Sequence, residues 1–418
     1  MARWLHPTSS RRRIGYLGLL ALVLGAAVPL TAAADRPSHP SPGSWVGTWA
    51  TSPQALTGTS LAGHSVRLIV HTSTAGDRVR IRLSNAFGTG PATFASVTVG
   101  RAGAGAGIDG NTATMTFGHS ETVSIPAGAD ALSDPVALRV GAAENLAVSL
   151  YVTGTAGPST GHADARQTSY IAAGDHTAEL GDNAFTSSTT NWYWLTGVDV
   201  DATGGHSSVV AFGDSITNGA NSTANANRRW PDYLAGRLAE GSHGSSMGVL
   251  NEGIDGNEVL TYRSCCGTSI PALARLDRDV IAQPAARVVV VLLGTNDIGA
   301  DGASGAAVIT GLQQVVAQLH AAGKQVVGGT ITPDEGCAFG CYSPSAEAAR
   351  EAVNAWIRDS GTFDAVADFD RALRDPADPQ RLSPGYDSGD HLHPNDTGYR
   401  AMAAAVDLAT LRRLAASE

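Results

Sequence analysis

The chain has 418 residues and a formal net charge of −10, with 16% charged and 43% hydrophobic residues. This composition allows a buried core and excludes extensive disorder, because disordered chains are poor in apolar residues and rich in charge. The length is roughly two to three times that of an ordinary domain, so we expect more than one folded unit. The acidic balance argues against nucleic acid and anionic membrane surfaces as partners, since both would repel the protein.

The first 34 residues have the pattern of a secretory signal peptide. A basic stretch that ends at Arg13 precedes an apolar run over residues 14–30, and three alanines that end at Ala34 offer a cleavage site. An uncleaved membrane anchor is the alternative, which the Gly and Pro residues within the apolar run disfavour. The basic stretch also resembles a twin-arginine signal, so the Sec and twin-arginine routes both stay open. We expect a secreted, extracellular protein without stable membrane insertion, whose net charge changes from −10 to −14 because the signal holds four arginines and no acidic residue.

Residues 35–44 are predicted to be a linker with Pro and Ser, and residues 45–203 an all-β, jelly-roll-like sandwich. In the second segment, short runs alternate apolar and polar side chains, and Gly, Asn and Pro separate them, as is typical of antiparallel strands. The clearest runs are residues 65–70, 79–83 and 146–152. No long amphipathic helix interrupts them, so the sequence predicts an N-terminal β-domain.

Residues 204–418 are predicted to form an α/β domain, because strands alternate there with helical stretches. The expected strands are residues 209–212, 249–251, 288–293, 326–330 and 365–368, and helices are expected from Trp230 and over residues 308–321. Five such strands indicate a flavodoxin-like, three-layer α/β/α sandwich, whose ligand crevice lies at the carboxyl ends of the strands. Motifs that carry chemistry should therefore directly follow strands.

The four cysteines are Cys265, Cys266, Cys337 and Cys341. In an exported protein they can form two disulfides in any of three connectivities, and the sequence leaves the choice open. A zinc site is the alternative, but the adjacent Cys265 and Cys266 lack the two-residue gap of zinc knuckles. We expect structural disulfides on loops.

A serine and an aspartate–histidine pair stand where hydrolytic chemistry is expected. Ser215 directly follows the strand at 209–212, a position that holds its hydroxyl at the crevice. Asp390 and His393 are three residues apart and share one face of a turn, so the carboxylate can orient an imidazole that deprotonates serine. Ordinary alternatives are a turn serine, and a helix cap beside an exposed histidine. A metal site of Asp390, His391 and His393 is disfavoured, since alternate residues point in different directions.

Two further motifs follow predicted strands. Residues 251–257 contain Gly253 and Gly256, and residues 294–297 contain Asn296. A glycine N–H and a side-chain amide can together hold the oxyanion that forms when an acyl group is attacked. Each motif alone is more often an ordinary loop.

Together the four motifs, in this order and at strand ends, resemble the SGNH (GDSL-type) hydrolase superfamily between Val209 and Leu411. Residues 47–50, 83–88 and 387–394 look like those of actinobacterial GDSL hydrolases with an N-terminal β-domain. The resemblance implies that Ser215 is the nucleophile and first oxyanion donor, His393 the general base and Asp390 its orienting partner. It also implies that the Gly256 N–H and the Asn296 amide are further oxyanion donors, with Gly253 as the competitor of Gly256, and that no metal or organic cofactor is required.

The function that the resemblance implies is that of a serine esterase. Its expected substrates are O-acetyl or other short acyl esters on carbohydrate, with an acylated polysaccharide as the natural form. A GDSL lipase or arylesterase that acts on medium or long acyl esters is the first alternative. A non-catalytic carbohydrate-binding protein and a serine peptidase are alternatives of other classes. Neither the natural ester nor the oligomeric state follows from the sequence.

Overall fold

The computed structural model describes residues 45–58, 60–155, 157–202, 207–240, 247–262 and 269–417. The predicted signal peptide and linker, residues 1–34 and 35–44, lie outside these residues. So do Cys265, Cys266 and the predicted domain boundary at 203–204. Gly43–Glu418 form one compact unit.

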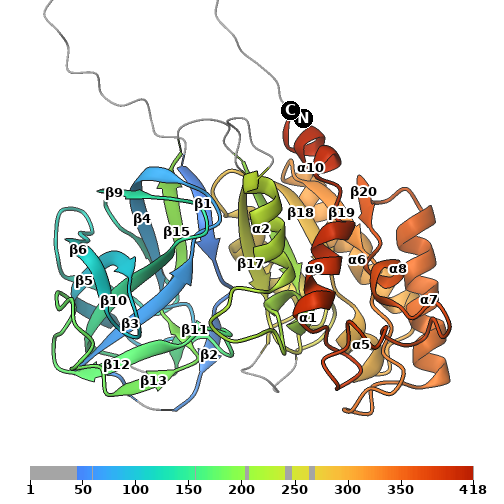
Figure 1. The fold of residues 1–418 in the computed structure, drawn as a ribbon, viewed down its shortest axis with the longest axis horizontal. Coiled ribbons are helices and arrows are strands. Elements are labelled where there is room, and N and C mark those ends of the chain that lie inside the picture. Colours follow the sequence, from blue (N-terminus) through green and yellow to red (C-terminus); the bar gives the residue numbers. More distant parts are fainter. Residues whose placement is uncertain are drawn as a thin grey trace, which may run out of the picture. The chain divides into compact units, whose positions relative to one another are not determined.

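An antiparallel β-sandwich forms the first part of this unit, drawn from blue to green in Figure 1. One sheet contains β1 (Trp45–Ala50), β4 (Gly76–Ser84), β8 (Asp130–Leu132), β9 (Val136–Val140) and β15 (Leu195–Asp201), in the order β1-β15-β4-β8 with β9 beside β4. The other contains β3 (His64–His71), β5 (Ala92–Ala102), β6 (Ile108–Thr114), β7 (Val123–Ile125), β10 (Asn145–Gly154), β12 (Ser169–Ala173) and β13 (Ser187–Thr189), in the order β13-β12-β3-β10-β5-β6 with β7 beside β5. A small third sheet joins β2 (Gln54–Leu56), β11 (Ser159–His162) and β14 (Trp192–Tyr193).

Alternation of side chains explains why these segments form a sandwich. In β4, Val79, Ile81 and Leu83 are fully buried, whereas Arg80 and Arg82 between them reach the surface in part. The buried side chains of β4 belong to the same hydrophobic cluster as those of β3 and β10 in the facing sheet. The cluster therefore fills the space between two sheets, and the three strands predicted in this segment are confirmed as β3, β4 and β10.

A parallel sheet forms the second part of the unit. Its strands are β16 (Ser208–Gly213), β17 (Gly248–Gly253), β18 (Ala286–Leu292), β19 (Gln325–Gly329) and β20 (Ala365–Ala367), in the order β17-β16-β18-β19-β20. All six residues of β16 are buried, as expected for a central strand that is covered on both faces. The strand order is the flavodoxin-like one, so the predicted α/β class and its five strands are confirmed, with small differences at the strand ends.

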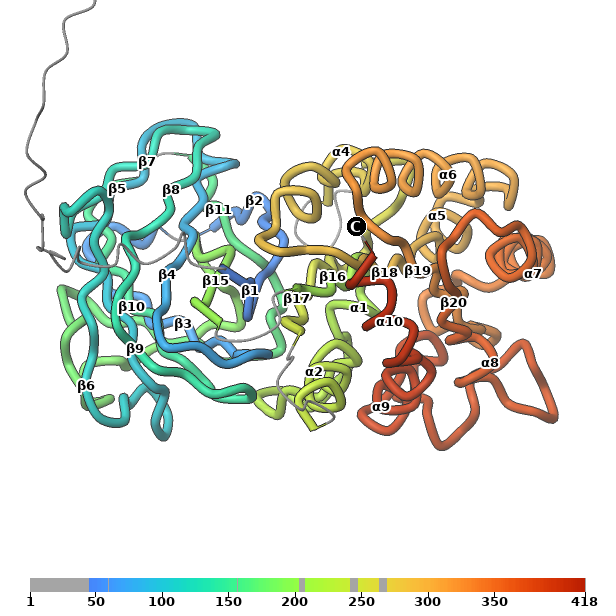
Figure 2. Tube along the Cα trace, turned by 90° about the horizontal axis from the view of Figure 1, so that it is seen from above, coloured from blue at the N-terminus to red at the C-terminus, as the bar shows by residue number. Residues whose placement is uncertain are grey.

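Helices cover both faces of this sheet (Figure 2). On one face α4 (Ala272–Leu276), α6 (Gly305–Ala321) and α7 (Pro344–Asp359) pack on Val289 and Val291 of β18. On the other, α2 (Trp230–Glu240), α9 (Asp396–Ala405) and α10 (Leu408–Ala415) pack on Val288 and Val290. The other short helices in the described residues are α1 (Ser215–Asn218), α5 (Thr295–Gly299), α8 (Phe369–Leu373) and the π-helix η1 (Asp277–Ile281). Among the described residues, no helix combines the length and apolar character that a membrane span requires.

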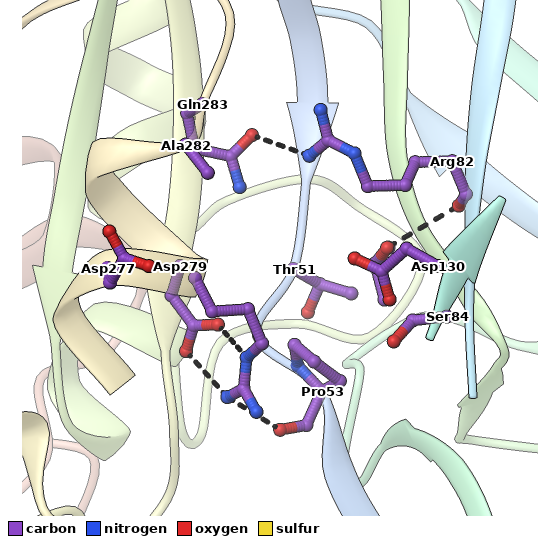
Figure 3. Close-up of a pocket in the computed structure, with 11 residues that line it drawn as sticks. Thr51, Pro53, Arg82, Ser84, Asp130, Asp277, Asp279, Ala282 and Gln283 are labelled. Atoms are coloured by element: carbon purple, nitrogen blue, oxygen red, sulfur yellow. Dashed lines mark hydrogen bonds and ion pairs between the residues drawn. The ribbon is translucent and has the colours of Figure 1, made fainter. Parts of the chain in front are cut away.

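The sandwich and the α/β part meet along the edges of β1 and β17. A side chain at Gly248 would place its Cβ 2.0 Å from the Gly47 carbonyl oxygen, so this close approach requires glycine. The backbone N–H of Val249 donates to Ser73 Oγ at 2.9 Å, and the same hydroxyl donates to the Thr48 carbonyl of β1 at 2.6 Å, so Ser73 links β17 to β1. A polar cavity of about 300 Å³ lies at the same junction, where Arg82 of the sandwich reaches Gln283 of the α/β part at 3.4 Å (Figure 3).

Candidate active site

The motifs found in the sequence lie at the carboxyl ends of neighbouring parallel strands. Ser215 begins α1 directly after β16, and Asp214 caps this helix by accepting the N–H of Ile216 at 2.9 Å. Gly256 follows β17, and Asn296 lies in α5 directly after β18. Asp390 and His393 lie in the loop before α9. Parallel pairing places these strand ends at one edge of the sheet, which is where a flavodoxin-like fold binds its ligand.

Ser215, His393 and Asp390 form a continuous hydrogen-bonded chain. The Ser215 Oγ lies 2.9 Å from His393 Nε2, and His393 Nδ1 lies 2.6 Å from Asp390 Oδ2. The backbone N–H groups of Leu392 and His393 donate to Asp390 Oδ1, which closes the turn that brings the carboxylate back to the imidazole. This geometry lets the imidazole accept the serine proton while the carboxylate orients it.

The carboxylate of Asp390 is held in its charged form. Burial would raise its pKa, but hydrogen bonds from the side chain and backbone of His393 outweigh burial and set the pKa well below its usual range. Asn221 also donates from Nδ2 to Asp390 Oδ2 at 2.8 Å. Sequence reasoning missed Asn221, because a single asparagine after the serine motif carries no distinctive pattern.

His391 takes no part in this chain. Its Nδ1 pairs with Asp387, which also accepts the backbone N–H of His391 at 3.1 Å. The described residues contain no cluster of three or more His, Cys, Asp and Glu side chains arranged to hold a metal ion. His393 is thus paired with Asp390, and His391 is paired separately with Asp387.

The predicted oxyanion donors line one pocket with Ser215. The pocket has a volume of about 380 Å³, and its walls include Gly256, Asn296 and His393. The Asn296 Nδ2 donates to the Asn257 carbonyl at 3.1 Å, which orients the amide.

The two glycines that competed for the role of oxyanion donor differ in position. Gly256 has φ of 72° and lines the pocket, so a left-handed backbone that favours glycine turns this segment towards Ser215. Gly253 ends β17, and its N–H donates to Asn251 Oδ1 at 3.0 Å. A Cβ at Gly253 would lie 2.3 Å from the backbone nitrogen of Asn218, so this glycine serves close packing under α1.

The β-sandwich contributes directly to the walls of the pocket. Arg166, which lies after β11, lines the pocket and pairs its Nη2 with Asp255 Oδ2 at 2.7 Å. Asp255 directly precedes Gly256 and also accepts the Asn218 amide at 2.7 Å. Burial raises the pKa of Asp255, and the charge of Arg166 opposes that rise. The segment that carries Gly256 is therefore held by a residue of the sandwich.

A fully buried arginine lies behind the site. Arg275 of α4 donates to the Gly213 carbonyl at 2.9 Å and to Asn257 Oδ1 at 3.0 and 2.8 Å. Gly213 stands two residues before Ser215, and Asn257 directly follows Gly256. Arg275 also donates to Ser52 Oγ of the sandwich at 2.8 Å and pairs with the buried Asp279 at 3.1 Å.

The Arg275 network thus supports the segments that carry Ser215 and Gly256 from within the protein. Sequence reasoning missed Arg275, as it missed Arg166, because charged residues in a sequence indicate surface positions unless their partners are known.

A short disulfide loop borders the pocket. Cys337 and Cys341 form a disulfide with a Cα–Cα distance of 5.8 Å, so one pairing among the four cysteines is settled. Cys265 and Cys266 lie outside the described residues. Within the loop, the Ala338 N–H donates to the Asp390 carbonyl at 2.9 Å, and Phe339 lies in the wall of the pocket. The loop is thereby fixed against the turn that carries His393.

Comparison with known proteins finds one family model that is similar to the α/β part. Residues 211–401 match the model of the GDSL-like Lipase/Acylhydrolase family. No curated protein matches the chain.

Several solved structures are similar to about half of this chain at low identity. They include a GDSL-like lipase from Bacteroides thetaiotaomicron (20% identity, 49% of this chain and 88% of that chain, TM-score 0.39) and a carbohydrate acetylesterase family member from Sinorhizobium meliloti (16%, 50%, 100% and 0.41). An aryl esterase from M. smegmatis is similar over 50% of this chain and 98% of that chain, at 18% identity and a TM-score of 0.39.

Proposed function

We propose that the protein is a secreted serine esterase that hydrolyses carboxylic esters through an acyl-enzyme, and the match of residues 211–401 to the GDSL-like Lipase/Acylhydrolase family model supports this proposal. The observation that carries the proposal is the chain from Ser215 Oγ through the His393 imidazole to Asp390, with distances of 2.9 and 2.6 Å. A serine activated in this way is a nucleophile for an acyl carbon.

Acylation follows from this chain. His393 Nε2 takes the proton of Ser215 Oγ, and the oxygen attacks the ester carbonyl carbon. The negative charge on the carbonyl oxygen is stabilised by the backbone N–H groups of Ser215 and Gly256 and by the Asn296 amide. The carbon–oxygen bond to the alcohol then breaks, and His393 returns the proton to the leaving alcohol.

Deacylation repeats the same steps with water. His393 takes a proton from water, the hydroxide oxygen attacks the acyl carbon on Ser215 Oγ, and the acid leaves as the proton returns to Ser215. Asp390 keeps the imidazole in one orientation and stabilises its positive charge in both halves of the reaction. These residues supply every proton transfer and every charge that the reaction needs.

The proposed substrates are O-acetyl or other short acyl esters on carbohydrate. The signal pattern of the first 34 residues and the acidic surface favour an extracellular neutral polymer over a nucleic acid or an anionic membrane. Arg166 lines the pocket, so the sandwich supplies part of the wall that surrounds a bound ester.

The test is hydrolysis of 4-nitrophenyl acetate, butyrate and decanoate by the purified protein and by its Ser215→Ala variant. Turnover that disappears in the variant is the expected result, with acetate preferred. A preference for decanoate would instead identify a lipase. Absence of Ser215-dependent turnover on any ester, including acetylated xylan, would overturn the proposal, and glycan binding without turnover would replace it with a binding function.

A further inference from the structure

Phe339 is an exposed aromatic side chain at the rim of the pocket. It is 69% exposed, whereas most large apolar side chains of the chain are buried. Its ring centroid lies 6.1 Å from that of the His393 imidazole, at an interplanar angle of 72°. Because Phe339 also lines the pocket, its exposed ring is available to a molecule that binds there.

The mechanism defines which half of an ester lies beside Phe339. His393 must donate its proton to the leaving oxygen, so the alcohol half of the ester lies on the imidazole side. The carbonyl oxygen points instead to Gly256 and Asn296. Because Phe339 flanks the imidazole, its ring borders the space of the alcohol and not that of the acyl group.

The loop that carries Phe339 is built to hold its position. The Cys337–Cys341 disulfide closes five residues into a ring, and the Ala338 N–H is tied to the Asp390 carbonyl at 2.9 Å. Gly299 packs against the other end of the loop, since a Cβ there would lie 2.7 Å from Cys341 Cβ. A binding surface that is held in place before the ligand arrives loses less entropy on binding.

We propose that Phe339 is a platform for the alcohol half of the substrate, and that it selects alcohols with a flat, apolar ring face, such as the C–H face of a pyranose. This inference rests on the proposed esterase function and specifies its alcohol. The disulfide loop fixes the Phe339 ring beside His393. Phe339 does not select the acyl group.

The experiment varies each half of the ester separately with wild type and Phe339→Ala. One series keeps the acetyl group and compares a mono-acetylated methyl glucoside with ethyl acetate. The other keeps the methyl glucoside and compares acetyl with butyryl. We expect Phe339→Ala to raise KM about tenfold on both glucoside esters and less than twofold on ethyl acetate, with kcat little changed. Phe339→Trp keeps an aromatic ring at this position, so its KM on the glucoside esters should stay close to that of wild type.

A matched control is Tyr262→Ala, which removes an aromatic side chain that is 58% exposed and does not line the pocket. It should leave both series unchanged. The double variant Cys337→Ser/Cys341→Ser should show the same selective loss as Phe339→Ala, because the platform is then no longer fixed.

The outcomes separate this inference from the proposed function. If wild type hydrolyses no ester in a Ser215-dependent manner, the proposed function fails. If wild type is active but Phe339→Ala loses equally on ethyl acetate and on the glucoside, or loses according to acyl length, the platform assignment is wrong while the esterase assignment stands.

Discussion

His162 of the β-sandwich lies against Asn218 of α1, with 3.0 Å between the imidazole Nε2 and the amide Oδ1. Asn218 is in the same short helix as Ser215, and its amide nitrogen bonds Asp255. Together with the Arg166–Asp255 pair, this contact makes the sandwich part of the framework around the nucleophile. A domain attached only for binding would not need a buried side chain in this place.

Arg166→Gln should lower kcat by about ten- to a hundredfold, because Asp255 loses the cation that holds it and the Gly256 N–H shifts relative to the oxyanion. Arg166→Lys should recover part of the rate. Steady-state kinetics on 4-nitrophenyl acetate measures both. Arg228→Gln is the matched control, since Arg228 forms a more exposed ion pair with Asp396. Equal rates for Arg166→Gln and wild type would show that the sandwich does not support the oxyanion segment.

Asn296→Ala should lower kcat by about 10²- to 10³-fold with little change in KM, the usual effect of removing one oxyanion donor. Asn296 also holds the Asn257 carbonyl, so a melting curve must accompany the kinetics. A rate close to that of wild type in a folded variant would exclude Asn296 from the oxyanion site.

Asp390→Asn should lower kcat by about 10²- to 10⁴-fold, because an amide cannot stabilise the imidazolium and can favour the wrong tautomer of His393. The asparagine oxygen can still accept the N–H groups of Leu392 and His393, so the turn should persist. Kinetics and near-ultraviolet circular dichroism together check this expectation. A variant with native spectrum and native rate would remove Asp390 from the mechanism.

Asp214→Asn should change how stability depends on pH. Burial raises the pKa of Asp214 from an ordinary value of 3.8 to about 7, and its Oδ2 has no hydrogen-bond partner among the described residues. Between these two values the folded state keeps a proton that the unfolded state has lost, so Asp214 makes stability fall as pH rises.

The variant lacks this group, and its free energy of unfolding should fall less over that interval, by about 2–4 kcal/mol. Denaturant unfolding at pH 4.5 and pH 8 measures the difference. Parallel changes in wild type and variant would show that Asp214 is ionised in the folded protein.

Arg275→Met should lower the free energy of unfolding by about 3–5 kcal/mol, because the buried acceptors on Ser52, Gly213 and Asn257 lose their donor, and Asp279 keeps only its pair with Arg278. Burial and the nearby charge of Asp279 already raise the pKa of Glu252 well above its usual value. Arg101→Met serves as the control, since its ion pair with Glu144 is exposed and should contribute about 0–1 kcal/mol. Denaturant melts compare the two. An Arg275→Met variant no less stable than Arg101→Met would mean that the buried network is energetically neutral.

The fold class and the placement of the motifs follow from local patterns. The alternation in β4 reflects the period of 2.0 of a half-buried strand, and the continuous apolar run at β16 reflects a strand that is covered on both faces, so both patterns are visible without a structure. Ser215, Gly256 and Asn296 each follow a strand within a few residues, and parallel pairing alone brings such positions to one edge. Asp390 and His393 meet because they are three residues apart in one turn.

Only the tertiary structure decided which side chains support Ser215 and Gly256. Ser52 donates to Glu252 across 200 positions of sequence, and Arg166 meets Asp255 across 89. No local periodicity links such pairs, and a charged side chain that ends up buried has the same sequence signature as one in water. The same holds for the exposure of Phe339, because whether an aromatic side chain is covered depends on which segments pack over it. The sequence by itself determined the strands and the side chains that follow them. Packing between distant segments decided which residues support and surround those side chains, since burial and long-range pairing are properties of the whole fold.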